Sequence, residues 1–158
     1  MLGYFANQQA TETSFNDEGW FMSGDLGTLL PDGSLRIEGR LKDLIIRGGH
    51  NIYPTHIEAL AHRHAQVKKA ACFPIAADRL GERACIAIIG DLPADDLLAH
   101  LAAEGLSKYD MPEYFIAMEA LPLTPSGKIL KRELVEMVKR GDIAPHFLRA
   151  TQSKGASA

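Results

Sequence analysis

Long apolar runs, cysteines and a basic leader are all scarce in this sequence of 158 residues. The longest unbroken apolar stretch runs only from Ala84 to Ile89, whereas a membrane-spanning helix needs about 20 apolar residues. The first residues contain neither a basic leader nor a sustained apolar region. We therefore expect neither a secretory signal nor a transmembrane segment. Only Cys72 and Cys85 occur, each inside an apolar run, which predicts buried, reduced thiols in a cytoplasmic protein.

Positive charge is absent from the N-terminal part of the chain. Arg36 is the first basic residue, and the segment before it has a charge of −5, against +2 for the rest. The whole chain has a net charge of −3, which argues against a nucleic-acid binder, because phosphate contacts require a basic face. The N-terminal segment, up to about Gly39, is too short to bury a core of its own. We therefore expect it to belong to a larger structure.

Hydrophobic periodicity and turn residues predict an α+β fold with a small, mostly antiparallel sheet flanked by helices. Pro54 suits the first turn of a helix, and Thr55 and Glu58 have the spacing of a capping box. Gly105 and Gly141 are expected to stop two further helices. The expected strands cover residues 20–22, 35–38, 44–46, 67–75, 83–89 and 113–118, and the expected helices begin at 54 and 95 and cover 129–140.

A lysine ends the loop that precedes the last predicted helix. If that helix begins at Ile129, Lys128 faces the positive end of the helix dipole, which is unfavourable by a few tenths to about 1 kcal/mol. Two interpretations stay open: a solvated lysine on a Gly-Ser turn, or a lysine presented to an anion on a mobile loop. A P-loop is excluded, because Pro122 occupies the position of its first glycine.

A second group of charges surrounds the predicted strand 44–46. Such a cluster is either a solvated face or, with two adjacent glycines that permit close backbone approach, part of a ligand site. A dinucleotide-binding fingerprint is excluded, because its third glycine is missing. The group consists of Arg40, Lys42, Asp43 and Arg47, followed by Gly48 and Gly49.

Asp25 and three histidines complete the candidates. Asp25 is either an ordinary turn aspartate or a short acceptor for vicinal hydroxyls. His56, His62 and His64 lie close in sequence but none are four apart, so they do not converge on a metal and are expected to be exposed helical histidines. We predict no metal site.

Four segments stand in a fixed order: Gly19 to Gly27 (GWFMSGDLG), Gly39 to Ile45 (GRLKDLI), Gly48 to Pro54 (GGHNIYP), and Pro122 to Arg132 with its Gly-Lys-Ile. Together they resemble the late motifs of the AMP-forming adenylating enzymes, which include acyl-CoA synthetases, firefly luciferase and the adenylation domains of peptide synthetases. The resemblance covers about residues 2–140. It implies a two-step reaction in which a carboxylate and Mg-ATP give an acyl-adenylate, whose acyl group then passes to the thiol of coenzyme A.

The resemblance also implies roles for single residues. Asp25 and Arg40 are expected to bind the ribose of ATP or AMP, Lys128 to reach the bond formed between carboxylate and phosphate, and Lys42 to be the hinge between the two half-reactions. Arg47, Gly48, Gly49 and His50 are expected to line the coenzyme A tunnel. His56 departs from the family, which commonly has an acidic residue there.

By the same resemblance, residues 1–41 are the β-rich end of a large AMP-binding domain, 42–145 form the small C-terminal domain, and 146–158 are a disordered tail. The triphosphate loop, adenine motif and acyl pocket of the family are missing, so we expect an acyl-CoA ligase of fatty or aromatic acid metabolism that is represented here by its C-terminal portion and inactive alone. Its expected partners are the large N-terminal domain, which binds most of the Mg²⁺, a small carboxylic acid and coenzyme A.

Two alternatives remain. The chain could belong to an adenylation domain that loads a carrier-protein thiol, although we expect coenzyme A to be the acceptor. It could also be a non-catalytic module for regulation or assembly.

Overall fold

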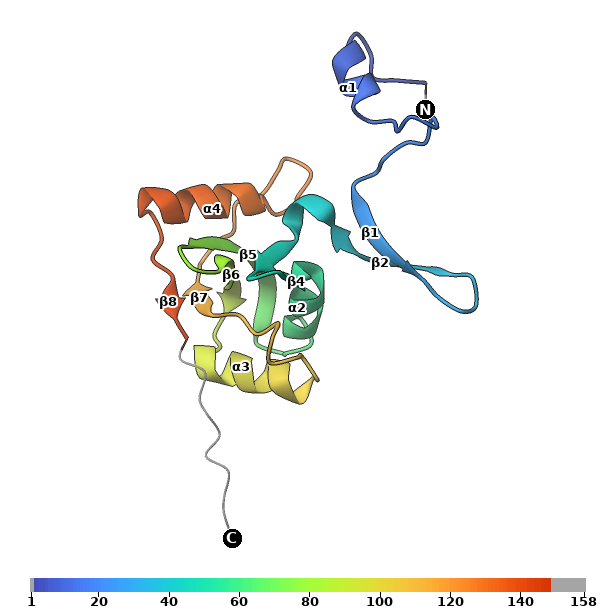
Figure 1. Cartoon of the computed structure of the whole chain (residues 1–158). Helices are drawn as coiled ribbons and strands as arrows, with labels where there is room; N and C mark the ends of the chain where they lie inside the picture. Colours follow the sequence, from blue (N-terminus) through green and yellow to red (C-terminus); the bar gives the residue numbers. More distant parts are fainter. Residues whose placement is uncertain (1, 149–158) are drawn as a thin grey trace. The chain divides into compact units, whose positions relative to one another are not determined.

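The computed structural model describes residues 2–148, and the chain divides into two compact units, Met1–Lys42 and Asp43–Ala158 (Figure 1). We call them the N-terminal and the C-terminal unit. The elements are α1 Gln8–Glu12, β1 Asp25–Leu29, β2 Leu35–Arg40, the 3₁₀ turn η1 Leu41–Asp43, β3 Ile45–Arg47, β4 His50–Ile52, α2 Pro54–Ala61, β5 Val67–Ala77, β6 Gly81–Gly90, α3 Ala94–Ala103, β7 Tyr114–Ala117, α4 Lys131–Arg140 and β8 His146–Phe147.

The N-terminal unit is built around the antiparallel pair β1–β2. Asp32 orders the turn between the strands, because its Oδ1 accepts hydrogen bonds from the backbone N–H and the hydroxyl of Ser34. Strand β2 confirms the prediction for 35–38, whereas β1 is not evident from the sequence, since Gly27 interrupts a short apolar run. None of the residues 2–42 is buried.

The predicted strand at 20–22 is wrong. A single antiparallel bridge joins Phe15 to Phe21, whose rings meet edge to face at 5.7 Å between centroids. The side chain of Asn16 closes the turn between them by accepting hydrogen bonds from the N–H groups of Glu18 and Trp20. An aromatic run gives only a bridge here, because no neighbouring strand continues the ladder.

The C-terminal unit contains a six-stranded sheet in the order β4-β3-β6-β7-β8, with β5 paired to β6. Only β6 and β7 run parallel, and the other pairs are antiparallel. The long β5–β6 hairpin turns between Ala77 and Gly81, where glycine takes a positive φ of 77°. The predicted α+β fold with a mostly antiparallel sheet is confirmed.

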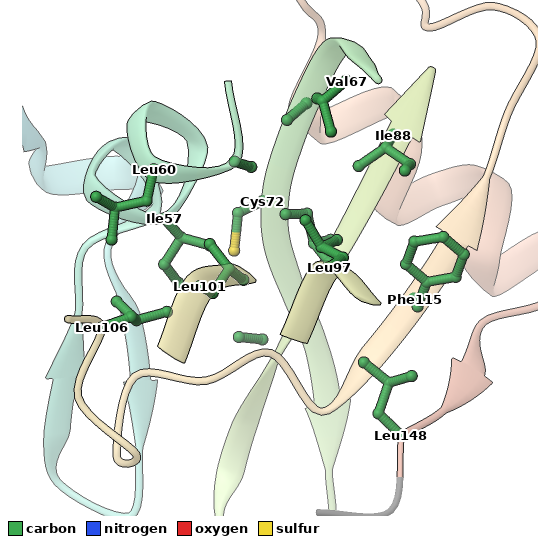
Figure 2. Packing of buried hydrophobic residues seen from close by; sticks show 14 of the residues in the cluster. Ile57, Leu60, Val67, Cys72, Ile88, Leu97, Leu101, Leu106, Phe115 and Leu148 are labelled. Atoms are coloured by element: carbon green, nitrogen blue, oxygen red, sulfur yellow. The ribbon is translucent and has the colours of Figure 1, made fainter. Parts of the chain in front are cut away.

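Helices cover both faces of this sheet. Successive residues of a strand point to opposite faces, so Cys72 packs in a cluster with α2 and α3, whereas Phe73 packs in a second cluster with α4. Figure 2 shows the first cluster, where Ile57 of α2 and Leu97 of α3 lie close to Cys72. Burial on both faces explains why β5 and β6 are apolar runs rather than alternating ones. No helix within residues 2–148 is long and apolar enough to cross a membrane.

Helix α2 begins at Pro54 as predicted, but the capping box is wrong. The N-cap residue is Tyr53, without a side-chain hydrogen bond. Glu58 instead accepts a hydrogen bond from the N–H of Cys72 in β5, at 2.7 Å.

Two ends near the C-terminus also differ from expectation. Helix α4 begins at Lys131 rather than Ile129, because Ile129 forms a bridge with Leu123, and it ends at Gly141 as predicted. Phe147 of β8 pairs with Tyr114, so the expected tail does not begin at 146. The remainder of that expected tail, 149–158, lies outside the described residues.

Candidate functional site

Asp25 and Arg40 face each other across the β1–β2 pair. Arg40 Nε lies 2.7 Å from Asp25 Oδ1, and the two side chains are 61% and 31% exposed. Gly24, directly before Asp25, has a φ of 75°. Its carbonyl accepts a hydrogen bond from the N–H of Leu41, the residue after Arg40. An exposed ion pair contributes at most about 1 kcal/mol. Its groups are therefore accessible and free to exchange this contact for one with a ligand.

Lys42 lies in η1, at the boundary between the two units. Its side chain is exposed. Asp43, the next residue, begins the C-terminal unit, and Ile45 two residues later is fully buried. Lys42 is therefore the last residue before the chain enters the unit that has a packed core. A change of backbone dihedrals at Lys42 itself would disturb no buried side chain of the N-terminal unit.

Gly48 and Gly49 form the two-residue turn of the β3–β4 hairpin, because Arg47 pairs directly with His50. Their φ angles are 57° and 86°. A two-residue turn with positive φ at both positions is the type I′ turn, which favours glycine. The turn thus explains both glycines by backbone conformation, whether or not a ligand also passes close to them.

Arg47 is held by the C-terminal unit itself. Its guanidinium donates to the carbonyl of Tyr109, and its Nη1 lies 3.1 Å from Glu113 Oε2. Only 14% of the side chain is exposed. The Arg47 side chain borders a pocket of about 550 Å³. The lining of this pocket includes two cationic residues, Arg47 and Lys108, and two acidic residues, Asp95 and Glu113. Arg47 therefore acts first as a structural cation.

His50 is more accessible. Its Nε2 lies 2.7 Å from Asp110 Oδ1, and its ring centroid lies 6.2 Å from that of Tyr109. About half of the His50 side chain is exposed. The loop at Tyr109 and Asp110 thus contacts both flanks of the Gly48-Gly49 turn, a proximity that sequence reasoning missed because these segments are about 60 residues apart.

Lys128 lies in a closed loop and not in the first turn of α4, so the helix-dipole interpretation is wrong for this residue. The bridge between Leu123 and Ile129 closes the loop. Thr124 orders it: its N–H donates to the Lys128 carbonyl at 2.8 Å, and its Oγ1 accepts from the Lys128 N–H at 3.0 Å. The Lys128 side chain is exposed, and its ammonium has no ion-pair partner within residues 2–148. The loop presents a free cation on an ordered backbone.

The lysine that does occupy the start of α4 is Lys131, and it is paired. Its Nζ lies 2.7 Å from Glu58 Oε1, with both side chains less than one-fifth exposed. Glu58 also binds the N–H of Cys72, so one carboxylate joins α2, β5 and the N-terminus of α4. This contact anchors the base of the Lys128 loop, and no local sequence pattern indicates it.

The two cysteines and the histidines at 56, 62 and 64 show no catalytic arrangement within the described residues. Cys72 and Cys85 are fully buried and free, as predicted, and burial raises the pKa of both thiols. His56 and His62 are exposed, as expected. The expectation is wrong for His64, which lies beyond the end of α2, is half-buried and packs edge-on against His100 at 4.9 Å between ring centroids.

The comparisons with known proteins agree with this arrangement. Residues 56–128 match the family model of the AMP-binding enzyme C-terminal domain. The medium-chain acyl-CoA ligase ACSF2 of rat mitochondria is 36% identical over 143 residues, which are 89% of this chain and 23% of the relative. The medium-chain fatty-acid–CoA ligase of Escherichia coli K12 is 35% identical over 135 residues, 82% of this chain and 24% of the relative.

A solved structure is also similar to the chain. The crystal structure of ATP-bound MatB from Rhodopseudomonas palustris superposes with a TM-score of 0.77 at 32% identity, covering 87% of this chain and 28% of MatB. The chain thus spans about a quarter of the length of the relatives that it matches. Fold, motif order and these likenesses agree: the chain belongs to the AMP-forming adenylating enzymes and carries their C-terminal domain.

Proposed function

We propose that the chain supplies the late catalytic segments of an ATP-dependent acyl-CoA ligase and works together with a large ATP-binding domain. In the first step a substrate carboxylate oxygen attacks the α-phosphorus of ATP, and pyrophosphate leaves. In the second step the sulfur of coenzyme A attacks the acyl carbonyl carbon, the bond between that carbon and the AMP oxygen breaks, and the thiol proton is released. The cytoplasmic location stays a prediction, since one relative is mitochondrial.

Lys128 is the observation that carries this proposal. Its ammonium is exposed and unpaired within residues 2–148, while Thr124 and the bridge to Leu123 hold its backbone. A cation held in this way can stabilise the negative charge that develops on the phosphoryl oxygens as pyrophosphate leaves. The partly buried Lys131–Glu58 pair supports the loop at its base.

The N-terminal unit supports the nucleotide role and the need for a large domain. Asp25 offers a carboxylate that can accept from both hydroxyls of a ribose, and Arg40 lies beside it. Large apolar side chains of β1, β2 and the preceding loop are exposed, among them Trp20, Leu29 and Leu35. We assign this apolar surface to contact with the large domain.

The proposal also covers the coenzyme A thiol that accepts the acyl group, the hinge and the magnesium ion. The Arg47–His50 turn would line the passage of the coenzyme A thiol, and Lys42 would be the hinge. Magnesium would be held with ATP by the large domain; within residues 2–148 no group of three His, Cys, Asp or Glu side chains could hold a metal.

A chimera tests the proposal. This chain would replace the region that it matches in the E. coli medium-chain fatty-acid–CoA ligase, and both half-reactions would be measured with a medium-chain fatty acid. We expect acyl-adenylate and thioester from the chimera, and no pyrophosphate from the chain alone. A folded chimera that forms no adenylate, or a chain that turns over alone, would contradict the proposal. Transfer to a carrier-protein thiol in preference to coenzyme A would favour the carrier-loading alternative.

Lys128→Ala in the chimera tests the catalytic role. Adenylation should fall about 10²–10³-fold, the usual effect of removing one preorganised transition-state donor. Thioester formation from chemically prepared acyl-adenylate should stay within a few-fold of wild type. Lys68→Ala, at another exposed lysine of the C-terminal unit, is the matched control. A parallel loss in both half-reactions would show that Lys128 is structural or acts in both steps, and would contradict its role in adenylation alone.

A further inference from the structure

His50 and Asp110 form a histidine–carboxylate pair at the tip of the β3–β4 hairpin. Asp110 Oδ1 lies 2.7 Å from His50 Nε2. An ionised carboxylate can only accept hydrogen bonds, so this contact places the proton on Nε2. In the neutral ring Nδ1 is then the free acceptor, and it has no hydrogen-bond partner within residues 2–148.

Asp110 is held from both sides of its loop. Its N–H donates to the carbonyl of Ser107, and the N–H of Tyr109 donates to the Ser107 hydroxyl. On the other side, Met111 packs against the core and the N–H of Glu113 donates to the carbonyl of Ala84 in β6. The backbone that carries the Asp110 carboxylate is therefore held in place.

The hairpin that carries His50 is fixed as well. Arg47, the cross-strand partner of His50, donates to the carbonyl of Tyr109, next to Asp110. The N–H of Ile46 in the same strand donates to Glu82 Oε2 at 2.8 Å. Two ordered segments thus orient the imidazole, while about half of its side chain stays exposed to a ligand.

Stability alone does not account for this arrangement. Exposed ion pairs contribute at most about 1 kcal/mol, and the type I′ turn requires glycine at 48 and 49 but places no demand on residue 50. A fixed carboxylate that sets the tautomer of an accessible imidazole is the arrangement that general-base catalysis uses.

We propose that His50 is the general base of the thiol-transfer step and that Asp110 is its positioning residue. This role rests on the proposed function, in which the coenzyme A thiol passes the Arg47–His50 turn. His50 Nδ1 accepts the proton of the thiol, the sulfur attacks the acyl carbonyl carbon, and the C–O bond to AMP breaks with its electron pair leaving on AMP. Asp110 stabilises the imidazolium and keeps Nε2 protonated.

The experiment uses the chimera described above and measures the two half-reactions separately. His50→Ala should lower thioester formation from prepared acyl-adenylate by about 10²-fold or more, the usual range for a general base, and leave adenylation unchanged. Added imidazole should restore part of the loss. His50→Gln keeps a donor for Asp110 but has no base, so it should be as slow as His50→Ala. Asp110→Ala should lower the same step by about tenfold.

Asp91→Asn is the matched control, because Asp91 is an exposed aspartate of the C-terminal unit without a side-chain partner among residues 2–148. The inference would be overturned if His50→Gln kept the wild-type rate, if imidazole restored nothing, or if both half-reactions fell together. A wild-type chimera that makes no thioester would instead contradict the proposed function itself.

Discussion

The two units of the chain differ in whether they have a core. Within residues 2–42 no side chain is buried, and Leu29, Leu35 and Ile37 are more than half exposed. The C-terminal unit has apolar clusters on both faces of its sheet, with Phe73 and Leu134 fully buried. Burial of apolar surface is the dominant favourable contribution to folding. The C-terminal unit can therefore stabilise itself, whereas residues 2–42 have no such core of their own.

Thiol reactivity should show the largest difference between the units. Cys72 and Cys85 are fully buried, and burial raises the pKa of each thiol. A cysteine placed in the exposed β1–β2 turn by Ser34→Cys should react with a disulfide reagent at once. The native thiols should react about 10³-fold more slowly, because an opening free energy of about 4 kcal/mol must first be supplied.

The comparison is made in one sample, since Ser34→Cys contains all three thiols. Denaturant provides the control, in which all three should react at the same rate. Equal rates without denaturant would show that the C-terminal unit is not a stable core.

Leucine truncations should show the next largest difference. Leu134→Ala removes a fully buried side chain of α4, and such changes cost about 2–5 kcal/mol in the free energy of unfolding. Leu35→Ala removes a side chain that is 63% exposed and should change stability by less than about 0.5 kcal/mol. Urea unfolding of the chain measures both. Equal costs would mean that the N-terminal unit packs against something within the chain.

The sequence predicts the parts of the fold that rest on local periodicity. Helix α2 from Pro54, the β5–β6 hairpin and the stop at Gly141 follow from apolar spacing and turn residues. Strand β1 does not follow from local periodicity, because its own residues show no strand pattern and it is defined by its pairing with β2. The start of α4 also differs, since Ile129 is taken up by a bridge to Leu123.

The candidate site divides in the same way. Lys128 and Asp25 are evident from motifs, but what surrounds them depends on contacts between distant segments. Glu58 has the spacing of a capping residue, yet it pairs with Lys131, a residue far along the chain. Likewise, nothing near His50 in the sequence indicates Asp110. Long-range pairs of this kind are set by the packing of the sheet and helices.

Lys42→Pro in the chimera tests the boundary between the units. Proline fixes φ and removes the backbone donor, so it should hold one orientation of the C-terminal unit. We expect the two half-reactions to be slowed unequally, by about tenfold relative to each other. Leu41→Ala, at the exposed neighbour in η1, is the control. Equal slowing of both half-reactions would count against a hinge at Lys42.

Asp25→Asn should have only a small effect on stability. The Asp25–Arg40 pair is exposed, so its loss should change the free energy of unfolding of the chain by less than about 1 kcal/mol. In the chimera the same variant should raise the KM for ATP. A loss of stability with no change in KM would show that the pair has only a structural role.

Hydrogen exchange tests most directly whether the N-terminal unit is completed by a large domain. Amide exchange in β1–β2 and in the C-terminal unit would be compared between the chain alone and the chimera. We predict that the β1–β2 amides of the chain alone exchange with little protection and become at least about 10²-fold slower in the chimera, while the β5–β6 amides are protected in both. Equal protection of β1–β2 in the two proteins would contradict the account.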